Sequence, residues 1–348
     1  MMATMDLGAQ GVTEEATELA DYIKEKIWQD PIAADLQWSL FLAALKNYKY
    51  DSLLRPFPPM YIGDDDEKDL TSLHKAVDSV PVLSRFCRDC YKQPTKLLEL
   101  IKWVLDARAF TLTSVGKNEF SKIRDLTGHT VKVPEPNYIF EVTPSIAADE
   151  KFLHLQNNRD LMYAYHGSRL ENFHSILHNG LASHMNKTSV FGEGTYLSSE
   201  LSVSMIYSPT GVAWDHSELG NRLSCIAVCE MIDDDAVKCQ NKPYSEDMKH
   251  VPSGTPTRSR ANAGPSEGGN VPEKYYVVQN NEVLRVKYLL VYAEKTVSHR
   301  SQVARGHSWI RQYKFSLIMF GYFIILCAIG LYNSQTCQMF WRRIWRSR

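Results

Sequence analysis

The sequence predicts an α+β protein built from three successive parts: a helical part, a strand-rich part and one transmembrane helix at the C-terminal end. Apolar residues recur at helical spacing over residues 20–112, and short apolar runs of strand length begin near residue 110. Residues 315–332 then carry no charge. The 348 residues are enough for one or two domains with a substantial core.

The overall composition is that of a folded cytosolic protein, with 44% hydrophobic and 23% charged residues. The formal net charge is −1, so no global positive field draws the chain to nucleic acid. The sequence also contains nothing that resembles a zinc finger or another DNA-reading module. A nucleic-acid partner is therefore not expected.

The first part of the chain begins with a polar and acidic segment, residues 1–19, that lacks the apolar core and basic flank of a secretory signal. We expect this segment to be a disordered lead-in. A helical domain over residues 20–112 follows, in which Asp30 is a predicted N-cap and Pro31 occupies the first helical position. Its last helix is expected near residues 95–109.

The strand-rich part, residues 113–293, is predicted to form the second domain. Its apolar runs of strand length are residues 138–143, 161–165, 223–232, 275–279 and 283–293. Between them, residues 233–272 are polar and rich in proline, glycine and serine. Such a composition buries too little apolar surface to become ordered, so this segment is predicted to be a flexible loop.

Seven cysteines are scattered along the chain, and an odd number suits free thiols in a reducing compartment better than a disulfide framework. Cys87 and Cys90 form a single C-x-x-C pair with no second ligand pair nearby. A structural zinc site needs four ligands. We therefore interpret this pair as two thiols of a helix, and no metal is expected.

The uncharged residues 315–332 would span ~27 Å as a helix at about 1.5 Å per residue, close to the ~30 Å hydrocarbon core of a bilayer. Trp309 and Tyr313 before them, and Trp341 and Trp345 after them, suit interfacial aromatic belts. The alternative is a buried C-terminal helix, which seldom runs this long without a polar face.

A span so close to the C-terminus predicts a tail-anchored protein. Residues 294–314 would be the linker, and residues 333–348 a short lumenal tail. Basic residues flank both ends of the span, so their distribution does not decide the orientation. The N-terminal segment carries no export signal, which favours a cytosolic N-terminus.

The most informative motif is the run from Tyr163 to Phe173, which contains His166-Gly167-Ser168, followed by Gly192-Glu193-Gly194-Thr195-Tyr196. Ser204 and Tyr207 then lie three apart on a helix predicted to begin near Ser198, so both point to one face. In this order and spacing, the motifs resemble the NAD-binding signature of the poly(ADP-ribose) polymerase superfamily, the diphtheria-toxin-like ADP-ribosyltransferases.

That resemblance implies an ADP-ribosyltransferase fold with a mixed or antiparallel sheet, preceded by a helical domain that would gate or brace the NAD site. It also implies that the nicotinamide ring lies between Tyr196 and Tyr207, and that the Gly167 backbone and the Ser204 hydroxyl hold its carboxamide. The His166 imidazole would bond a hydroxyl of the adenosine ribose. The residues implied to border the adenosine are Ser168 and Asn172.

The third catalytic position decides the length of the product. Polymer-forming relatives have a glutamate there, and counting back from the run at residues 287–290 places Tyr275 at this position. A phenol does not accept protons at neutral pH as a carboxylate does, so it should not activate a ribose hydroxyl for chain elongation. A shifted strand would instead bring Tyr276, Glu273 or Glu282 to the site.

The predicted catalytic residues are therefore His166, Tyr196 and Tyr275, in an NAD-dependent protein mono-ADP-ribosyltransferase that modifies itself and other proteins and releases nicotinamide. NAD is the co-substrate. The alternatives are a catalytically weak scaffold that binds NAD or ADP-ribose at a membrane, and an NAD hydrolase. The layout resembles that of a tail-anchored member of the superfamily in the endoplasmic reticulum membrane, which includes the nuclear envelope; the sequence alone also fits the mitochondrial outer membrane.

Overall fold

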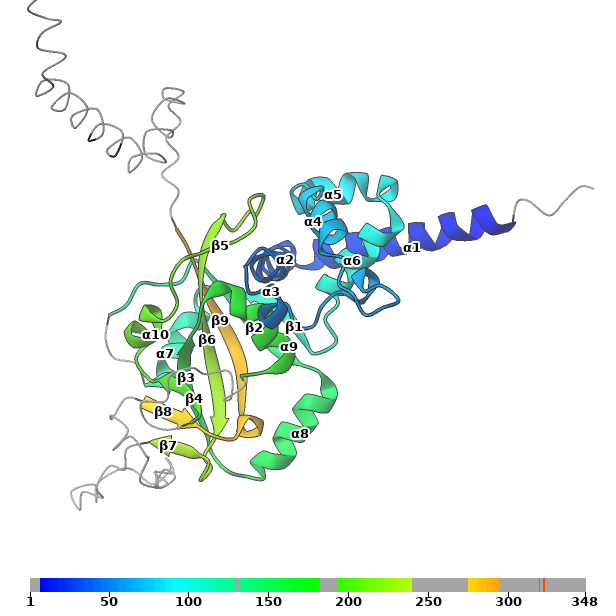
Figure 1. The fold of residues 1–348 in the computed structure, drawn as a ribbon. Coiled ribbons are helices and arrows are strands. Elements are labelled where there is room, and N and C mark those ends of the chain that lie inside the picture. Colours follow the sequence, from blue (N-terminus) through cyan, green and yellow to red (C-terminus); the bar gives the residue numbers. More distant parts are fainter. Residues whose placement is uncertain are drawn as a thin grey trace, which may run out of the picture. The chain divides into compact units, whose positions relative to one another are not determined.

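The computed structural model describes residues 7–128, 132–181, 193–239 and 275–294, together with Met319 and Tyr322. The chain divides into two compact units, Met1–Lys295 and Thr296–Arg348. The first unit contains all the helices and strands named below, and Figure 1 shows their arrangement.

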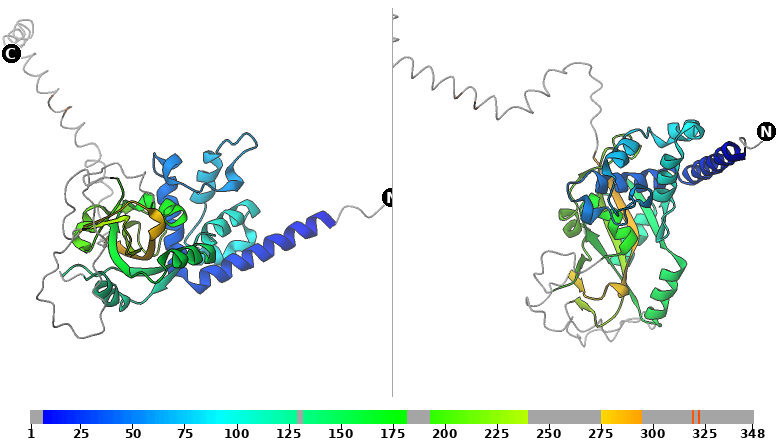
Figure 2. Two further views of the ribbon diagram at one scale, coloured as in Figure 1. Left: turned by 90° about the horizontal axis from the view of Figure 1, so that it is seen from below. Right: turned by 45° about the vertical axis from the view of Figure 1, so that its right-hand side comes forward.

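The first part of this unit is helical, as the sequence predicts. It consists of α1 (Leu7–Gln29), α2 (Pro31–Leu45), α3 (Tyr50–Leu53), η1 (Pro59–Tyr61), α4 (Leu70–Asp78), α5 (Leu83–Asp89), η2 (Cys90–Lys92) and α6 (Thr95–Leu105). The predicted cap of α2 is confirmed, because the Asp30 carboxylate accepts a hydrogen bond of 2.9 Å from the Ala33 backbone N–H. Figure 2 shows these helices from two further sides.

Two boundaries in this part differ from the sequence-based expectations. The chain is already helical at Leu7, so the expectation of a disordered lead-in over residues 1–19 is wrong from that residue onward. Ala20, Ile23 and Ile27 anchor α1 in the core, and a helix with a buried anchor extends at little cost through the preceding residues. The last helix ends at Leu105 rather than near residue 109.

The second part forms one sheet in the order β1-β2-β9-β6-β3-β4-β8-β7, with β5 paired to β6. Every pairing between these strands is antiparallel, which confirms the α+β class and the antiparallel alternative for the sheet. The strands are β1 (Phe110–Val115), β2 (Tyr138–Pro144), β3 (Leu161–Gly167), β4 (Thr195–Ser198), β5 (Gly211–Val212), β6 (Arg222–Ile232), β7 (Val237–Cys239), β8 (Tyr275–Val278) and β9 (Leu284–Ala293).

Further helices cover the two faces of this sheet. They are α7 (Glu119–Thr127), α8 (Ile146–Gln156), η3 (Leu170–Asn172), α9 (Phe173–Asn179), α10 (Leu201–Ile206) and η6 (Asn281–Val283). One face packs against α2, α8 and α9 in a large apolar core, and the other packs against α7 and α10 in a smaller one. Ala227 and Val228 of β6 belong to the first and the second core respectively, as the alternation of side chains along a strand requires.

Helix α2 belongs to two cores at once. Leu36 and Leu40 pack in the large core of the sheet, whereas Trp38 and Phe41 pack in a separate core made by the N-terminal helices. Thirteen of its fifteen residues are buried, so it is apolar on all sides. It is therefore the structural element that the two parts of the unit share.

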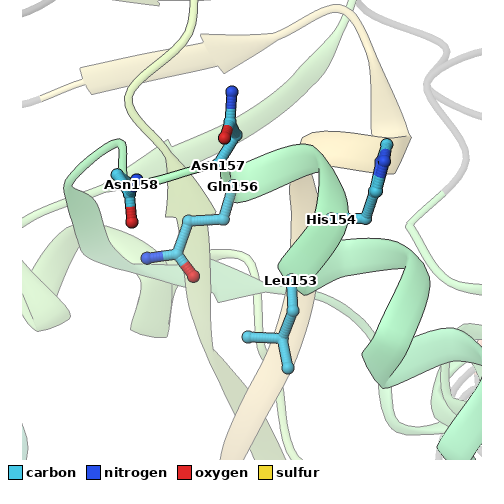
Figure 3. A pocket seen from close by; sticks show the side chains of 5 residues that line it. All are labelled: Leu153, His154, Gln156, Asn157 and Asn158. Carbon is cyan, nitrogen blue, oxygen red and sulfur yellow. The ribbon is translucent and has the colours of Figure 1, made fainter.

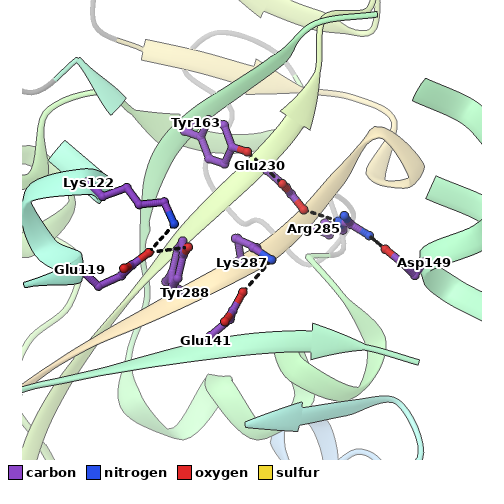
Figure 4. Close-up of polar contacts among 9 residues, drawn as sticks. All are labelled: Glu119, Lys122, Glu141, Asp149, Tyr163, Glu230, Arg285, Lys287 and Tyr288. Carbon is purple, nitrogen blue, oxygen red and sulfur yellow. Dashed lines mark hydrogen bonds and ion pairs between the residues drawn. The ribbon is translucent and has the colours of Figure 1, made fainter. Parts of the chain in front are cut away.

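A network of charged side chains crosses the sheet on β3, β6 and β9 (Figure 4). Glu230 on β6 accepts a hydrogen bond from the Tyr163 hydroxyl and pairs with Arg285, which also pairs with Asp149 on α8. Burial, reinforced by the Glu230 charge, raises the pKa of Tyr163 to about 12. Glu230 is thus a buried carboxylate whose two oxygens are both engaged.

The structure describes the first residues of the predicted flexible loop. Part of the expected flexible loop, residues 233–272, is ordered, because β7 pairs with β8 and its Val237 and Cys239 are buried. Residues 240–272 lie outside the described residues.

Cys87 and Cys90 are buried in the helical core. Burial raises the pKa of the Cys87 thiol to about 11, which agrees with the interpretation of this pair as two helix thiols.

Most of the predicted transmembrane helix lies outside the residues that the structure describes. Residues 315–332 lie outside them apart from Met319 and Tyr322, and so do residues 295–314 and 333–348. In the part of the chain that the structure does describe, no helix has both the length and the apolar character that a bilayer span requires.

Asp30 has a double role that can be tested by stability measurements. One of its carboxylate oxygens caps α2, and the other accepts a hydrogen bond of 2.6 Å from the Ser114 backbone N–H on β1. Asp30→Ala should therefore lower the free energy of unfolding by about 2–3 kcal/mol, measured by chemical denaturation. Asp69 caps only α4, so Asp69→Ala should cost about 1 kcal/mol. Equal losses in the two variants would contradict the double role.

Candidate active site

The predicted histidine lies near the end of β3, one of the central strands of the sheet. Its side chain is only 9% exposed, and its Nδ1 lies 2.9 Å from the backbone oxygen of Tyr196 on the neighbouring strand β4. A carbonyl oxygen only accepts, so Nδ1 carries the proton and donates it. Burial lowers the pKa of His166, which keeps the ring neutral at physiological pH. Nε2 is then an acceptor, suited to a ligand hydroxyl.

Gly167 follows directly and lies against the backbone of α10. A Cβ atom at Gly167 would meet the backbone oxygen of Ser204 at 2.0 Å and the Cβ of Tyr207 at 3.0 Å. No side chain fits at this position unless the helix moves. The glycine that the sequence suggested for the approach of a ligand therefore also serves the packing of α10 against the end of β3.

Hydroxyl and amide groups hold these two segments together. The Ser204 hydroxyl is buried and donates to the backbone oxygen of Tyr165 at 3.0 Å. The hydroxyl of buried Ser208 accepts the backbone N–H of Ser168 at 3.1 Å, and the Asn172 amide donates to the Ser168 hydroxyl at 2.8 Å. Two separate sets of hydrogen bonds therefore join the end of β3 and the residues after it to α10 and the residues after that helix.

The register of the strands places two of the three predicted aromatic residues, and α10 places the third. Ser198 of β4 pairs with Tyr275 of β8, and Tyr196 pairs with Val277. Tyr196 and Tyr275 are therefore diagonal neighbours on one face of the sheet, typically ~7–8 Å apart. Tyr207 follows the last residue of α10 and is 60% exposed, so its ring is open to a ligand.

Gly194 is the second glycine whose position excludes a side chain. It has a φ of 157°, and a Cβ there would meet Val277 at 2.6 Å and the Val278 backbone oxygen at 2.9 Å. The close approach of β8 thus explains the glycine immediately before β4. Gly192, the other glycine of the Gly192-Glu193-Gly194-Thr195-Tyr196 motif, lies outside the described residues.

Of the three alternatives to Tyr275, the structure describes Glu282 and Tyr276. Glu282 lies in η6 and pairs with Lys151 of α8 at 2.6 Å, in an exposed position. Tyr276 is buried, and its side chain belongs to the large core rather than to the face that carries Tyr275. Glu273 lies outside the described residues.

A surface pocket of about 540 Å³ lies elsewhere, at the C-terminal end of α8 (Figure 3). Its lining residues are Leu153, His154, Gln156, Asn157 and Asn158, none of which is a predicted site residue. On the β4 side of His166, the segment that leads to Gly194, residues 182–192, lies outside the described residues. We therefore define the candidate site by its strands and hydrogen bonds.

Two residues of this arrangement were not predicted from the sequence. Tyr165 pairs with Ser198, lies on the same face as Tyr275, and provides the oxygen to which Ser204 donates. Ser208 supports Ser168, and its own backbone oxygen accepts the Ser224 hydroxyl at 2.6 Å. No sequence signal identifies either one, because each acts on residues about 40 positions away in the chain.

Comparisons with known proteins agree with this architecture. Residues 117–294 match the poly(ADP-ribose) polymerase catalytic domain, and residues 25–105 match the ARTD15 N-terminal domain. Protein mono-ADP-ribosyltransferase PARP16 of Homo sapiens is 46% identical over 322 residues, which are 92% of this chain and 96% of the relative. Its Mus musculus counterpart is 46% identical over 325 residues, 93% of this chain and 97% of the relative.

A more distant relative, Mus musculus protein mono-ADP-ribosyltransferase PARP8, is 25% identical over 195 residues, which are 50% of this chain and 22% of that protein. Together with the fold, the two matched domains and the near full-length identity define the class: the chain belongs to the poly(ADP-ribose) polymerase family. Within the family it is an ADP-ribosyltransferase of the mono rather than the poly type, as its nearly full-length relatives are named.

The packing of Gly167 against α10 gives a direct test. Gly167→Ala should force α10 away from β3 and lower the free energy of unfolding by about 1–3 kcal/mol, as overpacking does. Binding of a nicotinamide analogue such as benzamide, measured by calorimetry, should weaken as well. Gly63→Ala is the matched control, because the nearest atom to its added Cβ lies at an ordinary 3.7 Å. If the two variants behave alike, the close approach has no consequence.

Proposed function

We propose that this chain is an NAD-dependent protein mono-ADP-ribosyltransferase that modifies itself and other proteins and releases nicotinamide. The observation that carries the proposal is the contact of the β3 end with α10. It brings His166 and Gly167 together with Ser204 and Tyr207 around one backbone junction. Members of the family use NAD as substrate, and the chemistry of the side chains at this junction fits that molecule.

The residues at the junction have separable roles in binding. Tyr196 and Tyr207 offer two aromatic rings for a flat nicotinamide, and each stacked pair contributes about 0.5–1.5 kcal/mol. The Gly167 backbone and the Ser204 hydroxyl would pair with its carboxamide. Ser204 already donates its proton to Tyr165, so it has lone pairs left for an amide N–H.

On the other side of the junction, His166 is suited to a ribose hydroxyl. Its Nδ1–H is held by Tyr196, which fixes the ring and leaves Nε2 to accept. Ser168 and Asn172, already bonded to each other, would border the adenosine.

NAD supplies an ADP-ribosyl group whose bond to nicotinamide breaks as a nucleophile of the acceptor protein adds to the same sugar carbon. The nicotinamide leaves with the electron pair, and the acceptor loses a proton to solvent. The chain contributes position and electrostatic stabilisation rather than a covalent intermediate.

The limit to a single ADP-ribose unit follows, in this proposal, from Tyr275. It lies diagonally across from Tyr196, at the position where a carboxylate would otherwise activate the next ribose hydroxyl. The buried carboxylate of Glu230 is already paired with Arg285 and bonded by the Tyr163 hydroxyl.

Labelling with NAD tests the activity. Purified full-length chain incubated with labelled NAD should become modified, and mass spectrometry should find single ADP-ribose units. His166→Ala should reduce the label by about 100-fold or more, the scale on which a misplaced substrate slows a reaction. His154→Ala, in the exposed α8 pocket, should not change it. A polymer ladder would contradict the role of Tyr275. Absent label with retained benzamide binding would indicate a scaffold, and free ADP-ribose without adduct a hydrolase.

We also propose that the chain is tail-anchored in the endoplasmic reticulum membrane, with the catalytic domain in the cytosol. The uncharged residues 315–332 and their flanking aromatic residues support this placement.

A glycosylation acceptor tests the orientation. An Asn-x-Thr site introduced in the N-terminal region should remain unmodified in cells, whereas one added beyond residue 348 should be glycosylated. Gel mobility before and after glycosidase treatment reports both. The reverse pattern would overturn the cytosolic placement. If fluorescence microscopy located the protein at the mitochondrial outer membrane, the choice of organelle would be wrong.

A further inference from the structure

The connection between β5 and β6 inserts into the helical part of the protein. Trp214, at the start of this connection, is 2% exposed and is the sole residue beyond position 105 that the helical core contains among the described residues. Its ring meets that of Trp38 on α2 edge to face, with centroids 6.3 Å apart and planes at 77°. The helical core is therefore incomplete without this side chain.

A buried carboxylate on the same helix holds the rest of the connection. Asp35 is 3% exposed, and it accepts the Ser217 hydroxyl and, at 2.8 Å, the Glu218 backbone N–H. Burial raises the pKa of Asp35, while these hydrogen bonds oppose the shift. Glu218 in turn accepts the hydroxyl of Ser84 on α5 at 3.1 Å. Two helices thus hold the tip of the β5–β6 connection.

The same helix α2 also packs against the segment that carries the predicted adenosine contact. It lies along η3, whose last residue is Asn172, and the amide of Asn47 just beyond α2 donates to Glu171 of η3 at 3.2 Å. β5 lies on η3 as well, because a Cβ at Gly211 would meet the Cβ of Leu170 at 2.9 Å.

These contacts sit close in sequence to the predicted ligand contacts. Trp214 is seven positions after Tyr207, and the intervening residues are fixed at Ser208 and at β5. Glu171 directly precedes Asn172. One helix therefore holds, from outside the site, both the segment on the nicotinamide side and the segment on the adenosine side.

We propose that Asp35 and Trp214 are positioning residues for the transferase reaction: through α2, they fix the spacing between Tyr207 and Asn172 and so set the affinity for NAD. The inference rests on the proposed function of the site. Neither residue touches the substrate. Coupling is reciprocal, so bound NAD must in return stabilise the contact between α2 and the β5–β6 connection.

Kinetics of the full-length chain test this role. Trp214→Ala and Asp35→Asn should raise the KM for NAD about five- to tenfold and change kcat much less. This factor is at the lower end of the affinity changes that coupling between two separate sites produces. Trp214→Phe keeps a ring in the helical core and should restore most of the affinity. The matched controls are Trp28→Ala and Asp51→Asn, exposed residues of the same helical part, which should leave KM unchanged.

Hydrogen exchange supplies a second readout that does not need turnover. Exchange of the amides in residues 208–221 should be faster in folded Asp35→Asn than in the wild type, and benzamide should slow it in the wild type. If Trp214→Ala fails to fold, Asp35→Asn and Trp214→Phe carry the test. Folded variants with wild-type KM and wild-type exchange would overturn the inference. A wild-type chain that binds neither NAD nor benzamide would instead overturn the proposed function.

Discussion

The contact between Gly167 and the backbone of α10 is the constraint on which the site depends. The two segments approach so closely that a single added carbon would meet the Ser204 oxygen at 2.0 Å. This approach allows Ser204 to bond Tyr165 and Ser208 to bond Ser168. A strand end and a short helix of six residues thereby act as one rigid unit, although neither would hold its conformation alone.

The surrounding sheet fixes the remaining groups. Pairing of β3 with β4 brings the Tyr196 carbonyl to the His166 ring, and pairing of β4 with β8 brings Tyr275 diagonally across from Tyr196. Each side chain is placed by backbone hydrogen bonds rather than by a mobile loop. Preorganisation of this kind lets a site act on a substrate without reorganising at the moment of reaction.

Local chemistry was readable from the sequence, and distant contacts were not. Asp30-Pro31 predicted the start of α2 because a cap and its helix are neighbours in the chain. The strands that contain His166 and Tyr275 were also located, since apolar runs mark buried strands. By contrast, Ser208, Asp35 and Trp214 act on partners roughly 40 to 180 positions away, which no local pattern reveals. The helical start of α1 was missed although Val12, Ala16 and Leu19 already recur at helical spacing ahead of the buried anchor.

The burial of α2 on all sides determines how this molecule can be divided. Leu36 and Leu40 on one side, with Trp38 and Phe41 on the other, make the helix a common wall between two apolar interiors. A transferase fragment that begins after residue 105 would expose the surface that α2 now covers, and an isolated helical fragment would lose Trp214. The two family models meet between residues 105 and 117, and the unit of folding extends across that division.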